Sequence, residues 1–290
     1  MSINSQKRNR SVLNVTGGII CICFISTWFT VAQTAIVESQ NARVNEVFVK
    51  PVLLIANDTA DPPSIKVKLL MSHVAWCQSR YHELLFGMDT FSIATNSPLI
   101  LRSRHAAATF KAAKDGGAEL ALIELMEHDK VNRFNCPFIY LVCFTGTGNW
   151  PAGGGRPING GVNTGGGIVI LAAESLTNSP NFQSTLQHEL GHSFGLPHVD
   201  VYGYSMKNNA SIMSYNPNHH TDGFMASKTP GRFILEDYRV LNMNHRAFPH
   251  FHIPESMFHP NGYKLSPRPI FLGPMKITGQ PDYNGPQIGF

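Results

Sequence analysis

Three observations predict an α/β fold for this chain of 290 residues. Apolar runs typical of β-strands alternate with segments whose apolar residues recur every three or four positions, as in amphipathic helices. Apolar residues make up 43% of the chain, which is enough for one large domain or two small ones. Charged residues make up only 14%, and 25 glycines and 19 prolines indicate long, shaped loops. This composition excludes a fibrous or disordered chain and suits an exported protein.

The N-terminal segment has the layout of an export signal. Lys7, Arg8 and Arg10 precede an uncharged stretch over residues 11–37. We expect residues 1–35 to be a signal peptide or, because the uncharged stretch exceeds the ~20 residues that span a bilayer, an uncleaved anchor. The protein would then be secreted, periplasmic or extracellular, or else membrane-anchored. The rest of the chain carries 20 positive and 19 negative side chains, a balance that does not indicate nucleic acid as a partner.

A strand and a helix open the predicted domain. Residues 48–55 (FVKPVLLI) predict the strand, and Pro51 favours a place at the end or edge of a sheet. Asp61-Pro-Pro-Ser64 then provides a helix start, and Gly87 a stop. The apolar stripe between them comprises Val67, Leu70, Val74, Cys77, Tyr81 and Leu84.

Further strands and a helix follow. Residues 91–101 predict a strand interrupted at Asn96-Ser-Pro98, and residues 118–129 predict a largely buried helix. Residues 138–144 (FIYLVCF) form an apolar run typical of a strand covered on both faces. We expect the last strand, residues 168–173, to run antiparallel at an edge.

A glycine-rich segment joins the last two strands. Residues 146–167 contain ten glycines, more than an ordinary connection carries. A flexible linker is one interpretation. Trp150 and the prolines at 151 and 157 favour a shaped surface loop instead.

Three cysteines, Cys77, Cys136 and Cys143, lie outside the N-terminal segment. They allow at most one disulfide. Three buried, apolar thiols are an equally good interpretation.

The strongest chemical signal lies on a helix predicted to begin at Ser179-Pro180. His188 and His192 are one helical turn apart and share one side of this helix. The apolar residues occupy roughly the opposite side, so that one face meets the core and the other a cleft. That apolar stripe comprises Phe182, Leu186, Leu190 and Phe194.

Residues 188–198 read HELGHSFGLPH. His188 and His192 can bind one Zn²⁺ from the same side, and Gly195 permits the left-handed turn that brings in His198 as third ligand. Three protein ligands leave a position for water, which distinguishes a catalytic zinc site from a structural one. Glu189 would accept a proton from that water. The short His-Glu-x-x-His pattern alone arises by chance at roughly one position in 8,000, and the longer pattern far more rarely.

These residues resemble the long zinc signature of the metzincin clan of metallopeptidases. The resemblance implies that Met213, 15 residues past His198, is the Met-turn residue that forms an apolar floor under the histidines. Tyr215 resembles the tyrosine that astacins and serralysins place near zinc, where it is an extra ligand or stabilises the oxyanion. The calcium-binding repeats of serralysins are missing from the sequence.

The resemblance also implies a fold and an activity. The fold would be of the zincin type, a twisted mixed sheet with an antiparallel edge strand over the active-site helix and a smaller irregular C-terminal subdomain with one helix, residues 233–244. The catalytic domain would cover residues 47–250, followed by a Pro/Gly-rich tail, residues 251–290. The protein would be a monomeric zinc endopeptidase, and its peptide or protein substrate would extend along the edge strand near residues 168–173.

Two other functions compete with this interpretation. Gly191-His-Ser193-Phe-Gly195 has the form of a serine-hydrolase nucleophile elbow, and Asp237 and His245 could complete a triad. An elbow requires a strand before the serine, whereas the residues before Ser193 have helical periodicity. A non-catalytic, secreted binding protein stabilised by zinc is the second alternative, and Glu189 argues against it because a closed structural site has no use for that carboxylate. The pair His219-His220 would lie in a loop, where adjacent histidines do not readily face one metal.

Overall fold

The computed structural model describes residues 47–113, 115–145, 153–177, 180–207, 209–215 and 231–254, which belong to one compact unit. The predicted signal or anchor, most of the predicted tail, and His219-His220 lie outside these residues. Within the described ranges, no helix is both long and apolar enough to cross a membrane.

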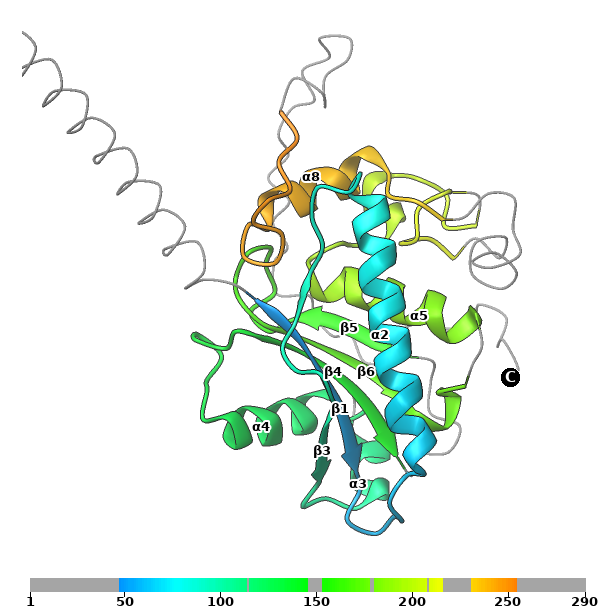
Figure 1. Cartoon of the computed structure of the whole chain (residues 1–290), viewed down its shortest axis with the longest axis vertical. Helices are drawn as coiled ribbons and strands as arrows, with labels where there is room; N and C mark the ends of the chain where they lie inside the picture. Colours follow the sequence, from blue (N-terminus) through cyan, green and yellow to red (C-terminus); the bar gives the residue numbers. More distant parts are fainter. Residues whose placement is uncertain are drawn as a thin grey trace, which may run out of the picture. The chain divides into compact units, whose positions relative to one another are not determined.

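A twisted, mostly parallel sheet forms the centre of the domain (Figure 1). Its strands run in the order β2-β1-β4-β6-β5, and β3 pairs with β1 beyond the end of β2. Among the strands that the structure describes, only β5 and β6 pair in antiparallel fashion. The strands are β1 (Phe48–Ile55), β2 (Ser92–Ile93), β3 (Leu99–Arg102), β4 (Phe138–Thr145), β5 (Gly154–Pro157) and β6 (Gly167–Ala172).

Helices cover both faces of this sheet (Figure 1). One face packs against α2 and α5 and the other against α3 and α4, because alternate residues of a strand point to opposite sides. In β1, for example, Val49 and Leu53 join the first core, whereas Val52 and Leu54 join the second. A smaller C-terminal region contains α8. The helices are α2 (Ser64–Leu84), α3 (Ala107–Ala112), α4 (Ala118–Asp129), α5 (Pro180–Ser193) and α8 (Leu235–Met243), with single 3-10 turns at Ala173–Ser175 and Val199–Tyr202.

Most of the predicted elements are confirmed. The strand predicted over residues 91–101 is split into β2 and β3 at the expected break. The stripe of α2 faces the core, and Cys77 is completely buried. Short helix α3 was not predicted, since six residues are too few for a clear apolar period. Cys77, Cys136 and Cys143 are buried free thiols.

The expected edge position of Pro51 is wrong. Strand β1 lies inside the sheet, with β4 on one side and β2 and β3 on the other. The Val49 carbonyl accepts a hydrogen bond from Ala94 at 2.9 Å, so Pro51, two residues later, faces the same side. There it meets the break between β2 and β3, where the missing N–H of proline leaves no partner unpaired.

The predicted edge strand is also wrong in position. Strand β6 (Gly167–Ala172) runs parallel to β4 and is covered on its other side by β5. The antiparallel edge strand is β5 (Gly154–Pro157), which lies in the glycine-rich segment. That segment is therefore in part a strand, which its glycines concealed because glycine is depleted in strands.

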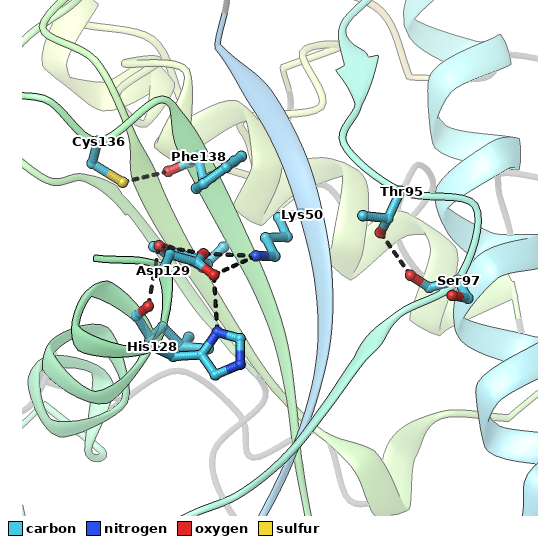
Figure 2. A network of polar contacts seen from close by, with 9 residues as sticks. Lys50, Thr95, Ser97, His128, Asp129, Cys136 and Phe138 are labelled. Carbon is cyan, nitrogen blue, oxygen red and sulfur yellow. Dashed lines mark hydrogen bonds and ion pairs between the residues drawn. The ribbon is translucent and has the colours of Figure 1, made fainter. Parts of the chain in front are cut away.

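A partly buried ionic cluster lies on the α4 face (Figure 2). The Lys50 ammonium donates to both carboxylate oxygens of Asp129, at 2.6 and 2.7 Å. The Tyr140 hydroxyl and the His128 ring also contact this carboxylate, each at 2.9 Å. Burial alone would raise the pKa of Asp129, but the hydrogen bonds from Lys50, His128 and Tyr140 lower it. We call these four residues the Lys50 cluster.

Candidate metal centre

Helix α5 positions the first two predicted ligands. Phe182, Leu186 and Leu190 are buried in the core between α5, α2 and the sheet, as predicted. His188 and His192 therefore project from another side of the helix. Ser179, the predicted cap, lies outside the described residues.

The three predicted histidines converge. The Nε2 atom of His192 lies 3.1 Å from that of His188 and 3.0 Å from that of His198, and the remaining distance, His188 to His198, is 3.2 Å. Within the described ranges, these residues form a group whose ligand atoms could hold one metal ion. We call them the histidine triad.

Hydrogen bonds on the far side of two rings define which nitrogen carries the proton. The Nδ1 atom of His188 lies 2.7 Å from the Ile212 carbonyl oxygen, and that of His192 lies 2.8 Å from the Leu196 carbonyl oxygen. A carbonyl only accepts, so each Nδ1 carries a hydrogen, and in a neutral ring Nε2 then presents a lone pair. Two lone pairs thus face each other across 3.1 Å, an arrangement that a cation between them would stabilise.

A left-handed turn brings in the third ligand. Gly195 has a φ of 98°, which glycine adopts without strain, and the Gly195 and Leu196 amides close the helix end on the carbonyls of His192 and Gly191. Burial and the neighbouring His198 lower the pKa of His192 to about 3. Burial also lowers the pKa of His198. These rings are therefore neutral at pH 7, the form that binds metals.

The side chain of Glu189, on α5, contacts the edge strand β5. Its carboxylate accepts a hydrogen bond from the Gly155 amide, yet burial raises its pKa to about 8. A cation on the histidine triad would oppose this effect. Any Cβ at Gly155 would overlap the Glu189 carbonyl oxygen, so the strand can approach the helix only through a glycine. Gly155 was not predicted as a site residue, although it lay in the glycine-rich segment.

The segment around Met213 packs beneath the triad. Met213 is completely buried, and a Cβ placed on Gly191 would lie 2.5 Å from its sulfur. Tyr215 is about half exposed, and its hydroxyl oxygen lies 3.0 Å from the Nε2 atom of His198. The structure thus places Tyr215 beside His198 and Met213 against Gly191 of α5.

The described structure does not have the geometry that a serine hydrolase requires around Ser193. Ser193 ends helix α5 instead of following a strand, and its hydroxyl donates to the Leu190 carbonyl at 2.8 Å. The carboxylate of Asp237 accepts a hydrogen bond from Ser211, and His245 is exposed. Neither residue forms a hydrogen bond with Ser193 in the described structure.

No protein-family model matches the sequence, and no curated protein matches it. Among solved structures, the chain is similar to wild-type OgpA from Akkermansia muciniphila in two crystal forms. The first has 15% identity, a TM-score of 0.45, and coverage of 73% of this chain and 63% of that one. The second has 14% identity, a TM-score of 0.43, and coverage of 72% and 63%. A catalytically inactive OgpA bound to an O-glycopeptide substrate, glycodrosocin, has 13% identity, a TM-score of 0.43, and coverage of 73% and 63%. The chain thus spans about 63% of the length of these structures.

Proposed function

We propose that this protein is a zinc-dependent endopeptidase of the metzincin type. The observation that carries the proposal is the histidine triad, whose Nε2 atoms lie 3.0–3.2 Å apart. Tetrahedral zinc with Zn–N bonds of 2.0–2.1 Å requires ligand nitrogens about 3.3–3.4 Å apart. Calcium and magnesium prefer oxygen ligands, so a set of three imidazoles favours zinc or a related transition metal.

The residues around the triad support a catalytic site over a closed structural one. His188, His192 and His198 would hold the ion, and Glu189 is not needed as a ligand. Bound zinc lowers the pKa of a coordinated water and polarises a carbonyl group. Glu189 would take a proton from the attacking water and pass it to the leaving amine. The Tyr215 hydroxyl, which points to the His198 nitrogen, would donate a hydrogen bond to the developing oxyanion.

The edge strand next to Glu189 is where we propose that a peptide binds. An extended peptide could add to the edge of β5 that pairs with no other strand among the described residues, and could bond to its backbone. Because Gly155 contacts Glu189, such a peptide would lie beside the general base. This proposal moves the substrate from residues 168–173, which are inside the sheet, to residues 154–157.

Metal analysis and proteolysis test the function. We expect the purified full-length protein to contain one zinc per chain and to cleave an unfolded protein such as casein. A chelator should abolish cleavage, and added zinc should restore it. Zinc binding without cleavage of casein or a peptide library would instead indicate a non-catalytic binding protein. Inhibition by a serine-directed phosphonate with no effect of the chelator would indicate a serine hydrolase.

We also propose that the protein is exported and that it is a monomer. Export rests on the charge pattern of residues 1–37. Cell fractionation and light scattering of the purified protein test the two expectations.

A further inference from the structure

Asp237 in α8 is a buried carboxylate that the proposed chemistry does not use. Its side chain is completely buried, and its Oδ2 atom accepts hydrogen bonds from the Ile234 amide at 3.0 Å and from the Ser211 hydroxyl at 2.7 Å. Its Oδ1 atom has no hydrogen-bond partner in the described structure. A neutral asparagine could accept the same hydrogen bond from the Ile234 amide without the cost of burying a charge. The buried charge therefore indicates a role of the carboxylate besides its hydrogen bond to the start of α8.

Ser211 connects this carboxylate to the segment beneath the triad. Its hydroxyl donates to Asp237 and, through a lone pair, accepts a hydrogen bond from the Met213 amide at 2.9 Å. An ionised carboxylate only accepts, so Asp237 sets the direction in which the hydroxyl points. The resulting row of bonds from amide to hydroxyl to carboxylate is polarised in one direction, which strengthens each bond.

Ile212 lies between Ser211 and Met213, and it touches a proposed metal ligand. Its carbonyl oxygen accepts the Nδ1 hydrogen bond of His188 at 2.7 Å. Because the Ser211 hydroxyl bridges to Met213 across this residue, it restrains the peptide group that carries the carbonyl. Such a hydrogen bond sets the tautomer and the ring orientation of a metal-binding histidine.

We propose that Asp237 is a positioning residue of the metal centre. Through Ser211 it holds the Ile212 carbonyl, which keeps the Nε2 atom of His188 directed at His192 and His198. This inference rests on the proposed metal site. It assigns to α8, a helix remote in sequence from the ligands, a defined effect on metal affinity.

Zinc affinity of the full-length protein tests this role. Ser211→Ala removes one oxygen atom, and Asp237→Asn keeps the shape of the side chain and one acceptor. We expect Ser211→Ala to weaken zinc binding about 10- to 100-fold, as loss of such a supporting contact does in other metal sites. Asp237→Asn should weaken it less than Asp237→Ala. Competition with a chromophoric chelator measures the affinity, and the visible spectrum of the Co²⁺-loaded protein reports on ligand geometry.

Asp89 offers a matched control. It is a buried aspartate that accepts hydrogen bonds from two backbone amides, of Thr90 at 2.7 Å and His250 at 2.6 Å, and neither belongs to the segment beneath the triad. Asp89→Ala should lower the stability but leave the zinc affinity and the cobalt spectrum unchanged.

The outcomes separate the two proposals. If wild type binds zinc and Ser211→Ala binds it equally well with the same cobalt spectrum, the positioning role is overturned while the metal site stands. The role is overturned as well if Asp89→Ala weakens binding as much as Ser211→Ala does. If wild type binds no zinc, the proposed function itself fails.

Discussion

Two partly buried polar clusters lie on opposite sides of the same sheet, and they differ in whether groups of the chain complete their interactions. In the Lys50 cluster, a cation and an imidazole contact one carboxylate (Figure 2), and the Tyr140 hydroxyl contacts the same carboxylate. In the histidine triad, three ring nitrogens meet within 3.2 Å, and two of them present lone pairs to each other. The first cluster is complete with groups from the chain. In the second, a cation from outside the chain would complete the arrangement.

A polar cluster whose groups satisfy one another stabilises the fold, whereas convergent acceptors favour the binding of a ligand. A buried ion pair with its hydrogen bonds made joins elements together, here β1 and β4 to α4. Acceptors that converge on one point repel one another unless a cation or a donor binds between them. Removing a residue from the first should therefore change folding, and removing one from the second should change metal binding and catalysis.

The largest effect that we expect is on catalysis. Glu189→Gln removes the proposed general base and keeps the shape of the side chain. The turnover number for peptide cleavage should fall about 100- to 10,000-fold, the usual contribution of such a group. Zinc content should remain at the wild-type level, because Glu189 is not a ligand. Wild-type turnover in this variant would contradict its assignment.

A large effect on folding should follow from breaking the Lys50 cluster. Lys50→Met leaves the carboxylate of Asp129, which is 8% exposed, without its cation. The free energy of unfolding, measured with urea, should fall by about 1–3 kcal/mol, because the pair is partly buried and the carboxylate keeps its hydrogen bonds with Tyr140 and His128. The double variant Lys50→Met with Asp129→Leu should recover much of this loss, since the uncompensated charge is then gone. Zinc affinity should be unchanged in both variants, and a change would mean that the two clusters are coupled.

Zinc should stabilise the folded protein by an intermediate amount. A ligand that binds only the folded state at 100 times its Kd adds about 2.7 kcal/mol to the free energy of unfolding. The melting temperature should therefore rise on addition of zinc to the metal-free protein and fall with a chelator. His192→Ala removes a ligand and should eliminate the response, whereas Lys50→Met should retain it.

The smallest expected effect, taken per pH unit, is the pH dependence of the metal-free protein. Burial lowers the pKa of His192 to about 3 from the ordinary value of 6.5. As the pH falls, this ring therefore takes up a proton in the unfolded chain before it does so in the folded protein. The resulting stability is present above about pH 6.5 and is lost as the pH falls towards 3, by at most about 1.4 kcal/mol per pH unit.

Variants isolate this titration. Glu189 has the opposite effect, because its raised pKa of about 8 makes stability fall as the pH rises above 4.5, so the comparison should use the Glu189→Gln background. In that background, adding His192→Asn should reduce the slope of the urea-derived stability profile between pH 4 and 6.5, and the lowered pKa of His198 accounts for part of the slope that remains. Equal slopes with and without His192 would show that this ring is not buried in its neutral form.

The residues of the site could be predicted from the sequence because the decisive relations are local. His188 and His192 are one helical turn apart in any α-helix, and Gly195 supplies a turn that few other residues adopt. Strands β1 and β4 could be found in the same way, from continuous apolar runs. Helix period and apolar runs depend on residues close together in the sequence, so both can be recognised from the sequence alone.

Only the tertiary structure decided which strand lies at the edge and what supports the ligands. Strand order depends on pairings between distant segments, which is why β5 could not be recognised as the edge strand and Pro51 was placed wrongly. The carbonyl of Ile212 accepts the hydrogen bond that orients His188. Every residue has such a backbone group, so the sequence gives no signal for this contact. Asp237 reaches the triad through Ser211, 26 residues away, a contact that exists only once the chain is folded.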